Sequence, residues 1–318
     1  MLKIAIKTLL NLIFWSIIQL IILLTNCKNS QSPETVNIKY RLDDFQIITL
    51  GETDRPYVWD VALSLDYPFE KDDNGVIMFD YEGNKYYHPV QIALWMLRYM
   101  DAFRITGNYE YITRSELFAN KLIELSMLIN GALYFPYNFS CPVHGDKKDK
   151  MIAPWYSGMA QGQTLSAFVR LFQATNNIKY SEIAGKIFKS FNNFKSNSNP
   201  WIVMIDIEGY YWIEEYPLDV PDHTLNGFIF GLYGLYDYFL LTNNNLCKEL
   251  LQAGITTIYH YIDQFRNPDG ISFYCLKHKK IPTANYHQVH IDQLKMLYKI
   301  TGENYFEEMA DNFSKDYP

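Results

Sequence analysis

Apolar residues along most of this chain recur about every three to four positions, which predicts amphipathic helices rather than strands. The helical periodicity begins near His88 and returns near Ser157, Thr224 and His287, at a spacing of roughly 60 to 70 residues. Each unit opens with a long helix, and a second helix follows it. The pattern therefore predicts an internal repeat of four helix pairs.

A similar short turn separates the two helices of every unit. It reads TGN at Thr106, TNN at Thr175, TNN at Thr242 and TGE at Thr301. Glycine and asparagine are typical of the position just after a helix. The turns therefore predict where the first helix of each pair ends.

Segments rich in aromatic residues, glycine and proline lie between the units and predict β-hairpins. They read GALYFPYNFSCPVHGD from Gly131, NPWIVMIDIEGYYWIEEYP from Asn199 and NPDGISFYCLKHKKIP from Asn267. Repeated helix pairs joined by hairpins predict a mainly α fold, an α/α toroid whose hairpins gather around one mouth. We expect any chemistry at that mouth.

The N-terminal residues predict an export signal. Lys3 and Lys7 precede an apolar run from Leu9 to Leu24, and Cys27 follows. This order resembles a bacterial lipoprotein signal in which Cys27 is acylated. An uncleaved signal anchor is the alternative, because Ile4 to Thr25 is about long enough to cross a bilayer of about 30 Å as a helix. Both readings predict a membrane-anchored protein whose main domain lies outside the cytoplasm.

The domain organisation follows from these patterns. Residues 1–27 are the predicted signal, residues 28–85 a linker with a short, turn-rich β lead, and residues 86–318 the toroid domain. The protein could also form a homodimer, because the sequence does not determine the oligomeric state.

Composition and charge narrow the classes of partner. The chain has 318 residues, 48% of them apolar, which is enough for one large core. Its formal net charge is −7, and its local basic run is the short KHKK at Lys277–Lys280. These features exclude a nucleic-acid-binding protein.

The cysteines predict neither a disulfide framework nor a metal. Cys141, Cys247 and Cys275 are odd in number and widely spaced. Cys141 and His144 form the one local cluster, and two ligands without a second pair are more often a turn than a zinc site. We therefore expect no metal.

Two adjacent glutamates precede the third unit. If residues 210–216 form a strand, Glu214 and Glu215 face opposite sides, and only one can point into a cleft. This weakens a glycosidase reading, which requires two carboxylates about 5 to 10 Å apart across the scissile bond. A second acid stays open, and the candidates are Asp206, Glu208 and Asp237.

The last two connecting segments also carry several groups that suit proton transfer at carbon. They are Glu215, Tyr216, Tyr274, Lys277, Tyr286 and His290. Removal of the C5 proton of a uronate adds negative charge at the neighbouring carboxylate, which a cation such as Lys277 could neutralise. A glutamate is an easier base than a phenol, whose pKa is near about 10.

Five ordered motifs resemble a known family, the D-glucuronyl C5-epimerases, which convert glucuronate to iduronate within heparosan-type chains. The motifs are YYHPVQIALW from Tyr86, PWYSGMAQGQ from Pro154, EEYP with LNGF from Glu214, FYCLKH from Phe273 and NYHQVHIDQL from Asn285. The resemblance implies an α/α barrel that acts on a uronate-containing polysaccharide without a redox cofactor.

The resemblance also implies catalytic roles. Glu215 and Tyr216 match the family's acidic and phenolic pair, Tyr274 a second essential tyrosine, and Tyr286 the tyrosine that faces the carboxylate across the ring. Glu215 and Tyr286 are then the two proton carriers. Tyr216 and Tyr274 hydrogen-bond the developing enediolate.

Further residues are expected to bind substrate. Gln91 and Asn226 are candidate sugar contacts, and Trp155 is the candidate stacking surface. Lys277 replaces the family's arginine, which keeps the charge and loses the bidentate fork. His290 is also a candidate substrate contact. Its alternative role is to cap a helix or to pack in the core. The family's large β-rich N-terminal region is reduced here to a short lead.

Three other readings stay open. A polysaccharide lyase takes the same proton and then eliminates the O4 substituent. A surface lipoprotein could bind uronate-rich glycans without turnover. The tyrosines could be packing residues, and the glutamates could pair with Lys277–Lys280 as a structural ion pair.

Overall fold

The computed structural model describes residues 40–66, 68–196 and 200–318. Residues 40–318 belong to one compact unit. The predicted signal, Cys27 included, lies outside the described residues. Among those residues, no helix has the length and apolar character needed to span a membrane.

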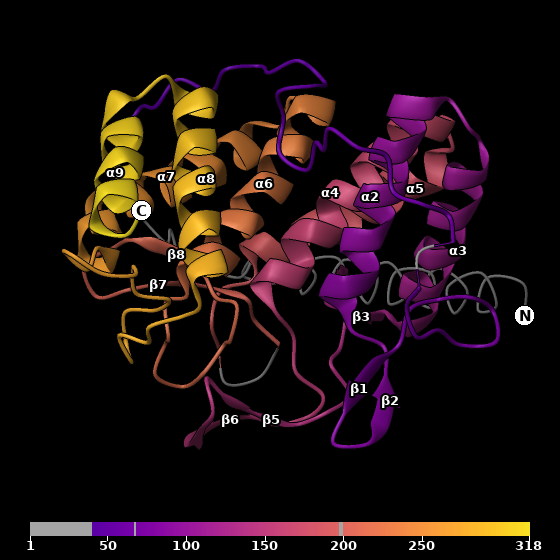
Figure 1. Ribbon diagram of the computed structural model, residues 1–318, viewed down its shortest axis with the longest axis horizontal. Coiled ribbons are helices and arrows are strands. Elements are labelled where there is room, and N and C mark those ends of the chain that lie inside the picture. Colours follow the sequence, from indigo (N-terminus) through magenta and orange to yellow (C-terminus); the bar gives the residue numbers. More distant parts are fainter. Residues whose placement is uncertain (1–39, 67, 197–199) are drawn as a thin grey trace, which may run out of the picture. The chain divides into compact units, whose positions relative to one another are not determined.

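The helices form four consecutive pairs in the described part of the chain, as the repeat predicted (Figure 1). The pairs are α2 (Pro89–Thr106) with α3 (Glu110–Leu125), α4 (Gly158–Thr175) with α5 (Ile178–Phe188), α6 (Leu225–Thr242) with α7 (Asn245–Phe265), and α8 (Ala284–Thr301) with α9 (Asn304–Asp316). A short 3-10 helix, η2 (Lys189–Asn192), follows α5. Helices α2, α4, α6 and α8 pack in series, and each also packs on its partner. The prediction of an α/α toroid built from four helix pairs is confirmed.

The repeated turns end the first helix of each pair as predicted. The residues after α2, α4, α6 and α8 are Gly107, Asn176, Asn243 and Gly302, and all four have left-handed backbone conformations. The turn threonine adds a second cap. In the first turn, the Thr106 hydroxyl donates to the Ala102 carbonyl at 2.7 Å and accepts the Asn108 N–H at 3.2 Å. The threonines of the other three turns make the same two bonds.

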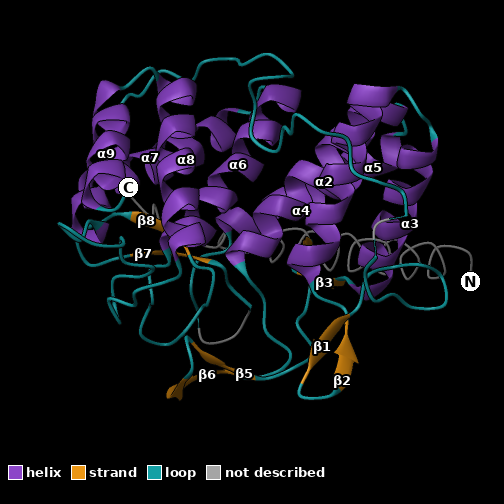
Figure 2. Ribbon diagram, viewed as in Figure 1, coloured by secondary structure: helices purple, strands orange, loops and turns teal. Residues whose placement is uncertain are grey.

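The strands of the described residues pair as short antiparallel hairpins at one end of the helices (Figure 2). They are β1 (Phe79–Tyr81) with β2 (Asn84–Tyr86), β3 (Met127–Ile129) with β4 (Ala132–Tyr134), β5 (Cys141–Val143) with β6 (Asp146–Met151), and β7 (Val203–Ile205) with β8 (Tyr211–Ile213). The first two predicted connecting segments therefore contain strands, as expected.

The hairpin predicted from Asn267 is wrong. Residues 267–283 form no regular strand, and their backbone bonds to the loop before α6 instead. The Leu225 N–H donates to the Tyr274 carbonyl, and the Lys277 N–H donates to the Asp222 carbonyl. This segment thus bonds the loop before α6, in addition to a bond of its own from the Tyr274 N–H to the Lys280 carbonyl at 2.7 Å.

The described residues of the lead, 40–66 and 68–85, contribute little β structure. Their β content consists of β1 with the first residues of β2, and one isolated bridge between Lys71 and Ile77. The rest runs as loops across the helices. Leu50 N–H donates to the Tyr236 hydroxyl at 2.9 Å, and Tyr236 donates to the Ile48 carbonyl at 2.8 Å. The lead therefore packs on the helices within the same compact unit, and the boundary predicted after residue 85 falls inside β2.

Candidate functional site

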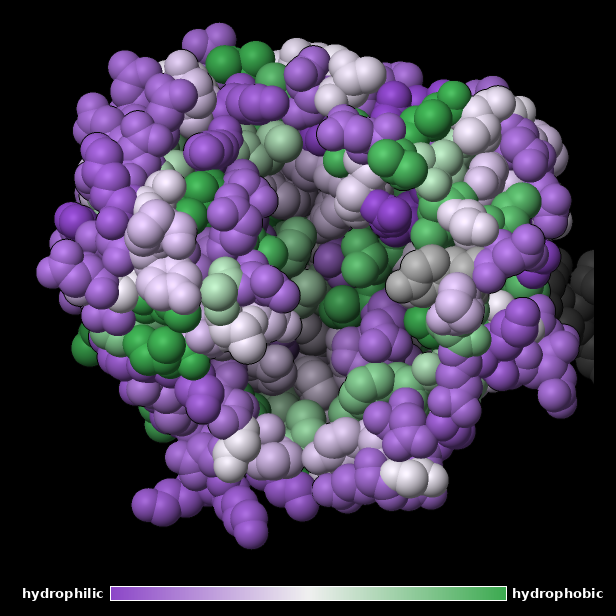
Figure 3. Space-filling model, viewed as in Figure 1, coloured by the Kyte–Doolittle hydropathy of each residue, from purple (hydrophilic) through white to green (hydrophobic). Residues whose placement is uncertain are grey.

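The connecting segments gather at the N-terminal ends of α4, α6 and α8, because each joins the outer helix of one pair to the inner helix of the next. A cavity of about 570 Å³ lies here, with Trp155, Pro217 and Lys277 on its walls. None of the four candidate catalytic residues lines this cavity, but Tyr216 directly precedes the lining residue Pro217, and its ring lies 6.0 Å from that of Trp155. Figure 3 shows one face of the molecule, hollowed near its centre, with polar and apolar residues around the hollow.

Glu214 and Glu215 follow β8 directly and have different partners, as the strand alternation predicted. The Glu214 carboxylate is fully buried, accepts the His223 N–H at 3.1 Å and lies 2.6 Å from His223 Nδ1. The Glu215 carboxylate lies 3.4 Å from the Tyr274 hydroxyl. Its side chain fits against α6 only because Gly227 has no Cβ, which would come within 2.3 Å of Oε2. Glu214 is therefore structural, and Glu215 belongs to the site.

Burial sets the acidity of Glu215. Loss of hydration raises the pKa of its carboxyl to about 7, and the negative charges of Asp222 and Glu214 act in the same direction. Hydrogen bonds from Tyr216 and Tyr274 oppose this change. A carboxyl with this pKa can both release and hold a proton near neutral pH, which suits a general acid or base.

The predicted phenols surround this carboxyl. Tyr274 is buried and bonds Glu215, and its ring meets that of Tyr286 edge to face, with centroids 5.2 Å apart. Tyr286 begins α8 and is 42% exposed, so its phenol reaches solvent. Burial raises the pKa values of Tyr216, Tyr274 and Tyr286, so all three are neutral donors at neutral pH. The structure brings the four predicted catalytic residues into one cluster.

Trp155 is held by a residue that the sequence analysis missed. Tyr137 stacks on the Trp155 ring with centroids 4.0 Å apart, and the indole N–H donates to the Phe139 carbonyl at 2.9 Å. One face of the indole is therefore covered by protein. Trp155 keeps a place on the cavity wall, but it is only 7% exposed. The aromatic run around Tyr137 was the available signal for this support.

Lys277 also lies on the cavity wall and pairs with Asp149 of β6. Asp149 additionally lies 2.7 Å from His278 Nε2. The alternative in which both glutamates pair with the lysines of this segment is wrong, because Glu214 pairs with His223 and Glu215 bonds tyrosines.

Asn226 lies in the first turn of α6 beside the same cluster. Its side chain hydrogen-bonds the Tyr274 phenol, and its backbone carbonyl accepts the Gln293 amide at 3.0 Å. Its Oδ1 atom is buried without a partner among the described residues. A buried acceptor without a partner is unusual, which keeps Asn226 a candidate sugar contact.

His290 and Gln91 lie differently. His290 is fully buried, its Nδ1 is 2.8 Å from the Ser272 hydroxyl, and burial lowers its pKa to about 3. This position fits the core-contact alternative. Gln91 lies in the first turn of α2, where its backbone N–H is capped by His88 Nδ1, and the His88 ring contacts Tyr137.

The other acids considered as a second carboxylate have structural partners. Asp206 accepts the Trp212 indole N–H at 2.8 Å, and Glu208 lies 3.3 Å from the Tyr261 hydroxyl. Asp237 is buried in a two-bond ion pair with Arg170. Each of these three acids therefore has a side-chain partner within the described residues.

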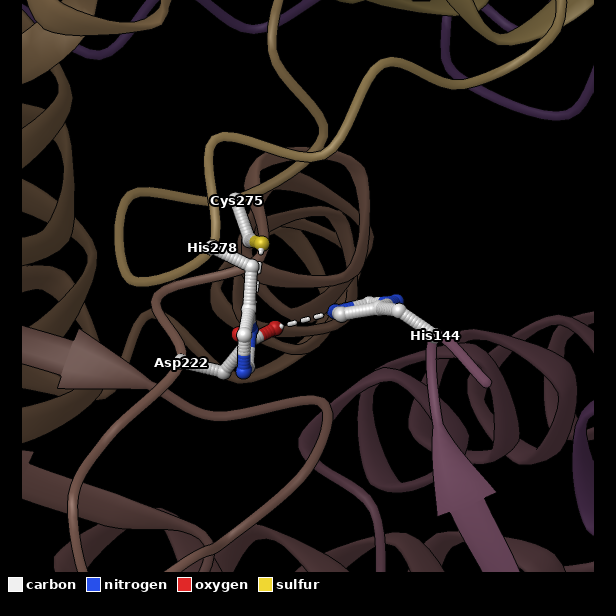
Figure 4. Close-up of side chains that lie close together, drawn as sticks. All are labelled: His144, Asp222, Cys275 and His278. Carbon is white, nitrogen blue, oxygen red and sulfur yellow. Dashed lines mark hydrogen bonds and ion pairs between the residues drawn. The ribbon is translucent and has the colours of Figure 1, made fainter. Parts of the chain in front are cut away.

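A second cluster joins three connecting segments (Figure 4). Its members are His144 from the β5–β6 turn, Asp222 from the loop before α6, and Cys275 and His278 from the segment after α7. One side-chain atom from each lies within 4.8 Å of the others. The sequence analysis paired His144 with Cys141, whereas the structure brings it to Cys275. The Cys-x-x-His spacing in FYCLKH was the overlooked signal.

Comparison with solved structures supports the fold. A sugar epimerase from a ruminal bacterium has a TM-score of 0.53 at 13% identity, covering 82% of this chain and 66% of that one. Cellobiose 2-epimerase from Bacillus thermoamylovorans B4167 has a TM-score of 0.51 at 14% identity, covering 77% and 66%. At these identities the likeness concerns the α/α toroid alone.

Comparison of sequences is more specific. The sequence model described as D-glucuronyl C5-epimerase C-terminus matches residues 130–315. The D-glucuronyl C5-epimerase of Caenorhabditis elegans is 31% identical over an alignment of 184 residues, and the match covers 52% of this chain and 29% of that protein. The chain thus matches less than a third of this relative's length, and the motif at Tyr86 lies outside the family match. Because that match covers more than half of the chain, the protein belongs to the D-glucuronyl C5-epimerase family through the C-terminal domain of that family.

Proposed function

We propose that this protein is a carbohydrate epimerase that inverts C5 of D-glucuronate to give L-iduronate within a polysaccharide. The observation that carries the proposal is the Glu215 carboxyl, buried among phenols with a pKa of about 7. Family membership supports the same reaction class.

The first step is removal of the C5 proton. Glu215 takes the proton as the C5–H bond breaks, and the electron pair passes into the uronate carboxyl as an enediolate. Neutral Tyr216 and Tyr274 phenols donate hydrogen bonds to the developing charge, which is worth most in a site that excludes water. We expect Asn226 Oδ1, which is buried and without a partner in the described residues, to accept a sugar hydroxyl in the substrate complex.

The second step returns a proton to the opposite face. The Tyr286 O–H bond breaks as the new C5–H bond forms, which leaves a phenolate on Tyr286 and a proton on Glu215. Tyr286 is 42% exposed, so it recovers its proton from solvent, and Glu215 releases its own. The net reaction inverts C5 and consumes no co-reactant.

Incubation of the full-length protein with heparosan in D₂O tests the proposal. Proton NMR is expected to show loss of the glucuronate H5 signal together with iduronate resonances. An unsaturated uronate chromophore with chain cleavage would identify a lyase instead. If the protein binds heparosan and other glucuronate polymers but exchanges no hydrogen at C5, it is a glycan-binding protein rather than an epimerase.

A further inference from the structure

We propose that His144, Asp222, Cys275 and His278 bind one zinc ion that fastens three connecting segments beside the Glu215 site. The four residues offer two imidazole nitrogens, a carboxylate oxygen and a sulfur (Figure 4). They come from segments up to 134 residues apart, so only the folded chain assembles them. This inference does not depend on the proposed epimerase activity.

The distances suit a tetrahedral ion after a small adjustment. His144 Nε2 lies 2.6 Å from Asp222 Oδ2, His278 Nδ1 lies 2.7 Å from Asp222 Oδ1, and Cys275 Sγ lies 3.8 Å from His278 Nδ1. Zinc bonds to nitrogen, oxygen and sulfur of about 2.0 to 2.3 Å place tetrahedral ligands roughly 3.3 to 3.8 Å apart. The cluster therefore needs to open by less than about 1 Å at the carboxylate, and its ligand atoms, which lie within 4.8 Å of one another, need to close by no more than about 1.5 Å elsewhere.

Neighbouring groups orient the ligands as they do in metal sites. His278 turns its other ring nitrogen, Nε2, to Asp149 Oδ2 at 2.7 Å. A carboxylate behind a ligating histidine fixes the ring and makes it a better ligand. The Thr224 hydroxyl donates to Asp222 Oδ2 at 2.7 Å and holds that carboxylate in place. Asp222 and Cys275 are fully buried, and the side chains of His144 and His278 are 8% and 18% exposed, so the cluster is largely withdrawn from water.

The ligand set selects zinc and a structural role. Thiolate disfavours magnesium and calcium, and mixed sulfur, nitrogen and oxygen ligands in a tetrahedral arrangement suit zinc. Four protein ligands also close the coordination sphere, whereas catalytic zinc sites keep a position open for water or substrate. The ion would therefore position residues rather than take part in the proton transfers.

The residues that it would position are those of the candidate site. Cys275 directly follows Tyr274, and the His144 ring lies edge to face on the rings of Tyr274 and Tyr216, at 5.1 and 5.5 Å between centroids. The segment that carries Cys275 and His278 forms no regular strand that could hold it in place. A cross-link from this segment to the β5–β6 hairpin would fix both phenols relative to Glu215.

Metal content of the purified full-length protein tests the proposal directly, by mass spectrometry of the elements after purification without chelators. We expect one zinc per chain, lost in His144→Ala, Cys275→Ser and His278→Ala. Cys247→Ser and His260→Ala are matched controls, because Cys247 is buried in α7 and His260 pairs with Asp43 at the surface. Both controls are expected to keep the ion. A wild-type protein that holds no stoichiometric zinc, even after incubation with zinc, would overturn the proposal.

Cobalt substitution identifies the ligands independently of activity. The cobalt-loaded protein is expected to show tetrahedral d–d bands and a thiolate-to-cobalt charge-transfer band. Cys275→Ser should remove the charge-transfer band, and Cys247→Ser should keep it. A wild-type spectrum without thiolate character would exclude Cys275 and overturn the four-ligand site.

A milder variant covers the case in which ligand variants do not fold. Asp149→Asn leaves all four ligands in place and weakens only the support behind His278. Loss of such a partner lowers metal affinity by about 10- to 100-fold. Unchanged zinc affinity in Asp149→Asn, measured by competition with a chromogenic chelator, would contradict the proposed coordination by His278.

Discussion

The Tyr274 hydroxyl lies 3.4 Å from Glu215 Oε2, although 59 residues separate the two in the sequence. The contact joins the segment after β8 to the segment after α7, and both lie at the N-terminal ends of inner helices. It places a neutral phenol on a carboxyl whose pKa is near neutrality. This pairing makes Glu215, rather than its neighbour Glu214, the expected proton carrier.

The two adjacent glutamates are expected to fail in different ways. Glu215→Gln should lower turnover by about 10²- to 10⁴-fold, the usual worth of a general base, and leave a folded protein. Glu214→Gln should instead destabilise the fold, by on the order of 1 to 3 kcal/mol, because it weakens the buried hydrogen bonds of Glu214 with the backbone N–H and ring of His223. Deuterium exchange at C5 and thermal unfolding of both variants measure the two effects. An active Glu215→Gln protein would refute the assignment.

Turnover is expected to rise with pH through about 7, because Glu215 must lose its proton to act as the base. Four groups face this carboxyl: Tyr216 and Tyr274 donate to it, and Asp222 and Glu214 repel its charge. The acid limb of kcat/KM should therefore lie near 7 rather than near 4.5. A limb near the ordinary glutamate value would contradict the burial of this carboxyl.

The same carboxyl makes stability depend on pH. Its folded pKa is raised from 4.5 to about 7, so folding favours the protonated form. Stability from this group is fully present below pH 4.5 and falls as pH rises to about 7. At about 1.4 kcal/mol per pKa unit, the buried charge costs on the order of 3 kcal/mol above pH 7. Glu215→Gln should therefore unfold at a higher temperature than wild type at pH 8, with the difference shrinking towards pH 5.

The sequence predicted the repeat because its signals are local. Each Thr-Gly or Thr-Asn turn caps a helix with atoms from residues no more than a few positions away, as at Thr106. Successive side chains of an extended backbone point to opposite sides, and this local rule is enough to direct Glu214 and Glu215, just after β8, to different partners. Such features depend little on the rest of the chain, so pattern and residue type were sufficient.

Features that depend on distant segments were not predictable in this way. The third hairpin failed because Tyr274 and Lys277 bond the loop before α6, which no local pattern reveals. His144 and Cys275 meet only when the β5–β6 hairpin folds against the segment after α7. The depth at which His290 is buried is also set by tertiary packing.

Tyr286→Phe separates the two protonation steps. The variant keeps Glu215, so it should still exchange the C5 hydrogen of glucuronate with D₂O, while iduronate formation falls by about 10²- to 10⁴-fold. The fold should be unaffected, because Tyr286 is 42% exposed and no hydrogen bond of its hydroxyl was found within the described residues. Proton NMR distinguishes the products. Iduronate at a near-normal rate would remove Tyr286 from the mechanism.

Gly227→Ala tests whether the position of Glu215 matters as well as its presence. The added methyl would come within 2.3 Å of Glu215 Oε2 and 2.6 Å of its Cβ, so the Glu215 side chain must leave its observed position. A misplacement of about 1 Å can cost about 10²-fold in rate, and we expect a loss of that order. Gly185→Ala in α5 is the matched control, because its methyl meets only the Tyr238 hydroxyl at 3.6 Å. The control should keep full activity and gain up to about 1 kcal/mol in stability from higher helix propensity. Equal activities of the two alanine variants would mean that Glu215 does not act from its observed position.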